Sequence, residues 1–135
     1  MRTDRDYYLV ENARVTITLD LFRRGSASSP QLNKVRFGDD RLAQGLRNDV
    51  TTYEVNGEPW VRARDGGVST FDAPAAGGHW WKLPAGTELP EEVVVVRDHA
   101  TPDGRTHYTL APSRDMAIFR FIAALERLHA RCVRV

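Results

Sequence analysis

The chain has 135 residues, 41% of them hydrophobic and 27% charged, and a formal net charge of +1. This length and composition predict a single domain spanning residues 1–135, large enough to bury a core without crosslinks. A net charge near zero argues against a global basic field for nucleic acid or an anionic membrane. The single cysteine, Cys132, excludes an internal disulfide.

The amino terminus is charged, and no segment has the apolar run of a signal peptide or of a membrane-spanning helix, which needs about 18 residues. We therefore expect a protein that is made in the cytoplasm and has no membrane partner. If it leaves the cell, we expect a route without a cleaved signal.

The first predicted elements are strands. Residues 7–10 are suited to an edge strand or an ordered arm, and residues 15–22 alternate apolar and polar side chains, the period of a half-buried strand. Arg23 continues the parity of the apolar set. Its guanidinium either enters the space at the end of the strand, where an anionic ligand could pair with it, or points to water, which the pattern alone favours.

A short helix and a hairpin follow. The pair Asp39-Asp40 caps a helix predicted over residues 41–47, with its acidic residues at the favourable end. The pair Asn56-Gly57 supplies the positive φ angles of a tight turn between strands at residues 53–55 and 60–63.

The second half of the chain predicts four more strands, at residues 68–71, 80–83, 93–96 and 106–111. The β-branched run at residues 93–96 is typical of a strand buried on both faces. A turn-rich connection is predicted over residues 98–105.

The last element is a helix. Ser113 is placed to cap it, with Asp115 in its first turn. Its apolar residues recur at helical spacing: Ile118, Phe121, Ile122, Leu125, Leu128 and Cys132. Five arginines follow Pro112, against two acids, and they indicate either a solvated face, which the pattern favours, or a patch for nucleic acid or an acidic partner. The sum is an α+β fold, mostly antiparallel strands in two small packed sheets with a long carboxyl-terminal helix.

Three phrases carry a resemblance to a known family: Gly66-Gly67-x-Ser69-x-Phe71-Asp72, Leu83-Pro84-x-Gly86-Thr87-x-Leu89-Pro90 and Thr106-His107-Tyr108-Thr109-Leu110-x-Pro112. In this order they resemble the Tse-type, NAD-dependent effector toxins of the type VI secretion system, which have an ADP-ribosyltransferase-like fold. Val95 and Asp98 fit between the second and third phrases, and the run Leu21-Phe22-Arg23 resembles the first strand of the family.

The resemblance implies a toxin that uses NAD on an unknown macromolecular acceptor and is neutralised in its producer by a cognate immunity protein or antitoxin. It implies catalytic roles for Ser69 and His107 and an NAD contact for Arg23. The expected NAD-binding set is Arg23, Ser69, Thr70, His107 and Tyr108. Nicotinamide could stack on Tyr108, Trp80 or Trp81. No metal is expected, since the histidines and Cys132 do not have zinc-ligand spacing.

The sequence departs from the resembling family in two places. Val68 stands where the family has a hydroxyl before the serine, and the usual late-strand catalytic glutamate is absent, with Glu88, Glu91 and Glu92 the nearest acids. Three readings stay open: ADP-ribosyl transfer, NAD hydrolysis without an acceptor, and a non-catalytic toxin that binds a protein or RNA.

Overall fold

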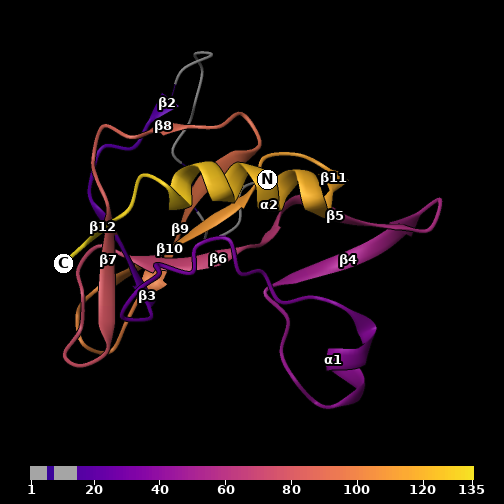
Figure 1. Ribbon diagram of the computed structural model, residues 1–135, viewed down its shortest axis with the longest axis horizontal. Coiled ribbons are helices and arrows are strands. Elements are labelled where there is room, and N and C mark those ends of the chain that lie inside the picture. The colour runs from indigo at the N-terminus through magenta and orange to yellow at the C-terminus, as the bar shows by residue number, and fades with distance from the viewer. Residues whose placement is uncertain (1–5, 8–14) are drawn as a thin grey trace.

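The computed structural model describes residues 6–7 and 15–135. Figure 1 shows strands crossed on one side by the long helix α2, with the short helix α1 set apart from them. In chain order the elements are β1 Asp6–Tyr7, β2 Val15–Thr16, β3 Leu21–Gly25, α1 Asp39–Ala43, β4 Val50–Val55, β5 Glu58–Gly66, β6 Val68–Phe71, β7 His79–Leu83, β8 Glu88–Leu89, β9 Val93–Ala100, β10 Thr106–Pro112, β11 Met116–Ala117, α2 Ile118–His129 and β12 Val133–Arg134.

The strands form three sheets within the described part of the chain. The largest has the order β1-β9-β10-β6-β3-β7-β12, a second has the order β11-β5-β4, and β2 pairs with β8 in a third. All of these strand pairs are antiparallel. The predicted α+β fold with mostly antiparallel strands is confirmed, with the short β2–β8 pair added to the two sheets that the sequence predicts.

The core lies between α2 and the large sheet. Ile118, Phe121, Leu125 and Leu128 are buried on the side of α2 that joins the hydrophobic core, as the helical spacing predicts. Ile122 and Cys132 pack at the edge of this core and keep partial exposure. Burial of an amphipathic face is the main source of stability for a helix of this length.

The start of α2 differs from the prediction. The helix begins at Ile118, and Ala117 occupies the cap position without a side-chain hydrogen bond. Ser113 instead donates its hydroxyl to the Glu91 carbonyl at 2.6 Å. The Asp115 carboxylate accepts hydrogen bonds from Tyr53 and from the Ala63 amide. Ser113 and Asp115, which the sequence assigns to the helix start, therefore bind distant parts of the chain instead. Strand β11 lies between these residues and α2, and it pairs with β5.

The strand predicted at residues 15–22 is interrupted. Residues 17–20 lie between β2 and β3 and are bound to the turn that follows β7: the Ile17 amide donates to Thr87, the Gly86 amide to Ile17, and the Ala85 amide to the Asp20 carboxylate. The bend separates β2, which pairs with β8, from β3, which enters the large sheet.

Other boundaries shift less. The predicted hairpin is confirmed as β4 and β5, with Asn56 at φ 50° and Gly57 at φ 81°. Helix α1 is shorter than the predicted 41–47 and starts at Asp39, and Gly45 has φ 74°. Strand β9 continues past the predicted residue 96 to Ala100. Strand β1 contains Asp6–Tyr7; residues 8–10 of the first predicted strand lie outside the described residues.

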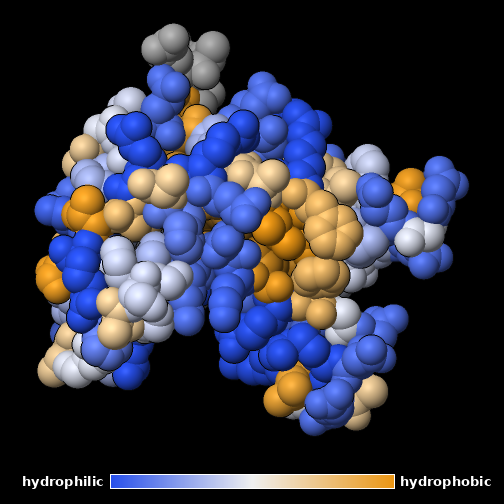
Figure 2. Space-filling model, viewed as in Figure 1, coloured by the Kyte–Doolittle hydropathy of each residue, from blue (hydrophilic) through white to orange (hydrophobic). Residues whose placement is uncertain are grey.

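The described residues include no membrane-spanning helix, and one face of the molecule carries an apolar patch (Figure 2). No helix among them has the length and apolar character needed to cross a membrane. Figure 2 shows a mostly hydrophilic face with an apolar patch near the first turns of α2. Phe119, 59% exposed, lies in this part of α2 and meets the ring of Phe37 edge-on at 6.3 Å.

Candidate active site

Strands β6 and β10 bring Ser69 and His107 onto one face of the large sheet. In their antiparallel register Ser69 lies opposite Thr109, and Phe71 lies opposite His107. Directly opposed residues of paired strands project from the same face. The alternate residues of both strands face the core under α2, so the predicted catalytic pair belongs to the other face of the sheet.

A bulge in β9 adds an acid to this face. The β9–β10 register shifts between His107 and Tyr108, so that His107 lies opposite His99 and Tyr108 opposite Arg97. Asp98 is the extra residue. Since a bulge re-aims the side chains beside it, Asp98 and its neighbour His99 both reach His107.

The Asp98 carboxylate joins two side chains of β10. Its Oδ2 atom lies 2.8 Å from Nδ1 of His107, and the same oxygen accepts a hydrogen bond from the Thr109 hydroxyl. The side chains of His107 and Asp98 are only 16% and 15% exposed. A carboxylate on one ring nitrogen of a histidine fixes its orientation and determines which nitrogen faces outward.

Aromatic rings hold the His107 imidazole on two further sides. The His99 ring stacks on it, with centroids 5.0 Å apart and planes 14° apart. The Phe71 ring meets it edge-on at 5.1 Å. Together with Asp98, these contacts leave the His107 ring little rotational freedom, which is the preorganisation that a reacting group needs.

Arg23 is half-buried, and its guanidinium binds two backbone carbonyls instead of extending freely into water as the alternative expects. Phe22 lies opposite Phe71, so Arg23 projects from the other face of the sheet, and its guanidinium extends toward β6. It donates from Nη1 to the Ser69 carbonyl at 3.0 Å and from Nη2 to the Gln31 carbonyl at 3.1 Å. Its Nε is buried and has no hydrogen-bond partner. Burial lowers the pKa of Arg23, and nearby Asp49 opposes that shift; an arginine nevertheless stays charged at neutral pH.

A pocket of about 410 Å³ opens beside Ser69. It is lined by Arg36, Arg47, Asn48, Asp49, Gly66, Gly67, Ser69 and Thr109, and its volume lies within the range of ligand sites. Asp49 accepts two hydrogen bonds from the Arg36 guanidinium, at 2.8 and 3.2 Å, so Arg36 is partly neutralised. Arg47 is exposed and forms no side-chain ion pair within the described part of the chain.

Two residues of the predicted NAD-binding set lie elsewhere. Thr70 is fully buried and donates its hydroxyl to the Tyr108 carbonyl at 2.9 Å. Tyr108 is 5% exposed and belongs to the hydrophobic core. The structure therefore places the side chains of Ser69 and His107 on one face of the sheet and those of Thr70 and Tyr108 on the opposite face. Arg23 contacts Ser69 through the backbone carbonyl of that residue.

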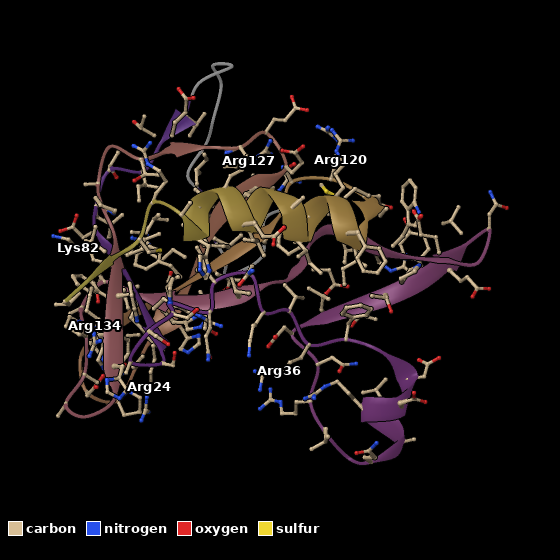
Figure 3. All side chains as sticks on the ribbon, viewed as in Figure 1. Arg24, Arg36, Lys82, Arg120, Arg127 and Arg134 are labelled. Carbon is tan, nitrogen blue, oxygen red and sulfur yellow. The ribbon has the colours of Figure 1, made fainter. Side chains whose placement is uncertain are left out.

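Two of the glutamates that stand nearest to the expected place of the catalytic acid form ion pairs with arginines of α2. Glu91 and Glu92 form ion pairs with Arg120, and Glu92 also pairs with Arg127. Figure 3 shows Arg120 and Arg127 on the same side of α2. The acid beside His107 is Asp98, which sequence reasoning placed in the turn-rich connection. Its place between the second and third phrases of the resemblance is the signal that the sequence offers, but the bulge that aims it is not visible in the sequence.

The donor set fits NAD as a ligand. The pocket offers the hydroxyl of Ser69 together with the two arginines Arg36 and Arg47, while Arg23 reaches Ser69 from the other face of the sheet through the Ser69 carbonyl. These groups suit ribose hydroxyls and a diphosphate. In the described residues no three His, Cys, Asp or Glu side chains converge as metal ligands would.

The α+β architecture, with antiparallel strands in three sheets and a carboxyl-terminal helix, agrees with the class of proteins that have an ADP-ribosyltransferase-like fold. The model of the Tse2 ADP-ribosyltransferase toxin family matches residues 14–134, and the chain belongs to this family. No curated protein matches the chain. Membership supports a toxin with ADP-ribosyltransferase-like activity, for which NAD is the substrate.

Proposed function

We propose that this protein is an NAD-dependent ADP-ribosyltransferase toxin that inhibits the growth of a target cell and is neutralised by a cognate immunity protein or antitoxin. The observation that supports it best is the grouping on one sheet face of Ser69, Thr109, Asp98 and His107, beside a pocket that contains arginines.

The reaction breaks the bond between nicotinamide and C1′ of the ribose. Nicotinamide leaves with the electron pair of that bond, which makes it neutral and leaves positive charge on the ribose. A lone pair of the acceptor forms the new bond to C1′, and the acceptor gives up its proton to a base. The site must therefore bind the diphosphate, hold the ribose hydroxyls, and accept a proton.

The proposed roles follow the chemistry of each group. Ser69 binds a ribose hydroxyl or the nicotinamide amide, because its side chain is exposed at the pocket. Arg23 adds positive charge and holds the Ser69 carbonyl in place. His107 binds or deprotonates a hydroxyl of the substrate or the acceptor, with a ring already oriented by Asp98.

The direct test is incubation of the purified chain with NAD, labelled on the ADP-ribose portion, and a cell extract. Label on a macromolecule is the expected result. Release of nicotinamide with no labelled macromolecule would replace transfer by NAD hydrolysis. No turnover of NAD would overturn the enzymatic proposal and favour a toxin that acts by binding.

The binding alternative has less support on this surface. The arginines that could form a basic face on α2 include Arg120 and Arg127, and both are engaged with Glu92. Arg114 is engaged with Glu91. Pairing removes much of the free positive charge that an acidic or nucleic-acid partner would need.

A growth assay tests the toxin and its partner together. Expression of the chain in a bacterial cytoplasm is expected to stop growth, and co-expression of the cognate immunity protein to restore it. Growth that continues at normal rate with the folded chain present would contradict the proposed toxicity.

A further inference from the structure

We propose that Asp98 is the positioning residue of the site: it holds His107 in the tautomer with its proton on Nδ1, so that the lone pair of Nε2 meets a hydroxyl of the substrate or acceptor. The inference rests on the proposed function, because it identifies the acid that supports His107 in that reaction.

The first support is the hydrogen-bond chemistry of the pair. An ionised carboxylate only accepts hydrogen bonds, so the 2.8 Å contact between Asp98 Oδ2 and His107 Nδ1 requires the proton on Nδ1. In a neutral imidazole the other nitrogen is then an acceptor. When Nε2 takes a proton, the ring becomes a cation, and the adjacent carboxylate stabilises that charge.

The second support is that the carboxylate itself is held. The Thr109 hydroxyl donates to the same oxygen, and Thr109 lies directly opposite Ser69 in the sheet. A carboxylate that merely paired with an exposed histidine would not need this second donor. The contacts connect Ser69, Thr109, Asp98 and His107 in one row across β6, β10 and β9.

The third support is the local backbone. A regular β9 would send Asp98 and His99 to opposite faces, whereas the bulge between the His107 and Tyr108 positions lets both contact His107. The extra residue disrupts the ladder, and bulges of this kind occur next to active sites, where they aim a side chain. Here the residue that gains its position from the bulge is Asp98.

The tautomer can be measured directly in the full-length protein. Long-range proton–nitrogen NMR of the histidine rings distinguishes a proton on Nδ1 from one on Nε2, with the pH raised until the ring is neutral. We expect the Nδ1–H form for His107. An Nε2–H form in the unaltered protein would overturn the proposal, and this measurement needs neither a variant nor turnover of NAD.

The Asp98→Asn variant tests the consequence for the reaction. The amide can donate to Nδ1, which would put the proton on Nε2. We expect His107 to change tautomer and kcat for nicotinamide release to fall by about 100-fold, with KM for NAD within about threefold. Unchanged tautomer and turnover would overturn the proposal.

Two further variants separate positioning from folding. Thr109→Val removes the second donor to Asp98 at nearly constant volume, so kcat should fall with little change in KM, and Thr109→Ser should restore it. Should Asp98→Asn fail to fold, an unchanged kcat in Thr109→Val would count against the proposal. The matched control is Glu58→Gln, which neutralises an exposed acid at the β4–β5 turn and should leave kcat unchanged. Absence of NAD turnover in the unaltered protein would contradict the proposed function, while the NMR result would still decide the role of Asp98.

Discussion

The side chain of Ser69 is exposed, while the carbonyl of the same residue accepts a hydrogen bond from Arg23. The Ser69 hydroxyl is therefore available to a ligand. The hydrogen bond from Arg23 to the Ser69 carbonyl holds the backbone that positions this hydroxyl. His107 has the opposite character, because its ring is packed by Phe71 and His99 and bound by Asp98.

We expect Ser69→Ala and His107→Ala each to abolish toxicity while the fold stays intact. Neither substitution removes a side chain from the hydrophobic core under α2. Growth assays measure toxicity, and thermal unfolding followed by circular dichroism measures folding. The control is Ser28→Ala, at an exposed loop position, which should remain toxic. Two folded variants as toxic as the parent would contradict the site.

Arg23→Lys should weaken both the fold and the activity. Lysine lacks the planar fork that lets Arg23 donate to the carbonyls of Ser69 and Gln31 at once, and a carbonyl left without a donor is costly. We expect a loss of about 1–3 kcal/mol in the free energy of unfolding, measured by urea denaturation, and a higher KM for NAD.

The neighbouring arginine supplies the control for Arg23. Arg24 is exposed, and its label in Figure 3 marks a side chain at the periphery of the molecule. Arg24→Lys should change stability by less than about 0.5 kcal/mol. Equal effects of the two substitutions would show that the buried contacts of Arg23 contribute nothing.

At the scale of elements, the junction of β5 and β6 lies very close to strand β10, and this close approach occurs at Gly67. Gly67 has φ 147°, and a Cβ atom there would lie 2.0 Å from the Leu110 carbonyl oxygen of β10. The β6–β10 pairing carries Ser69 and His107, so the geometry of the site depends on the absence of a side chain at Gly67.

Gly67→Ala should therefore cost at least about 2 kcal/mol of stability and reduce toxicity. Gly104→Ala is the matched control, because Gly104 also has a positive φ, 85°, but open space around its Cβ position. The control should cost about 1 kcal/mol. Similar losses in both variants, measured by chemical denaturation, would exclude a special role for the β6–β10 approach.

Helix α2 stabilises the sheet through its buried face. Leu125 is fully buried, so Leu125→Ala should lower the free energy of unfolding by about 2–5 kcal/mol. Phe119 is 59% exposed on the same helix, and Phe119→Ala should cost clearly less. Thermal or urea unfolding measures both losses. The prediction is wrong if Phe119→Ala lowers the free energy of unfolding as much as Leu125→Ala does.

At the scale of the whole molecule, Glu92 ties the outer surface of α2 to the start of β9. Its carboxylate binds Arg127 at 2.8 Å and Arg120 at 3.3 Å, and the residue is only 8% exposed. Burial alone would raise the pKa of Glu92, but hydrogen bonds and the charges of the two arginines outweigh it, so the pKa lies below its usual value of 4.5.

A lowered pKa in the folded state means that ionised Glu92 stabilises the protein above the ordinary glutamate pKa, and that this contribution is lost as the pH falls through the lower, folded-state pKa. We expect Glu92→Gln to cost about 1 kcal/mol at pH 7, with the difference from the parent disappearing as the pH falls below about 4. Urea unfolding across this pH range tests the prediction. A difference that persists undiminished under acid conditions would mean that Glu92 acts by packing and not by charge.

The sequence by itself determined the kinds of element and the family. The period of two at residues 15–22, the Asn56-Gly57 pair and the helical spacing from Ile118 to Leu128 are local signals, because they reflect which side chains can share one face or one turn. The three phrases of the resemblance also lie in single stretches of chain, and the family that they indicate is confirmed by the match over residues 14–134.

Only the tertiary structure decided which residues meet. The break before β3, the loss of Ser113 and Asp115 from the start of α2, and the inward position of Arg23 all follow from hydrogen bonds to distant segments. Asp98 reaches His107 because the register of β9 against β10 shifts by one residue. Register and bulges depend on pairing between strands, so a pattern read along one strand cannot predict them.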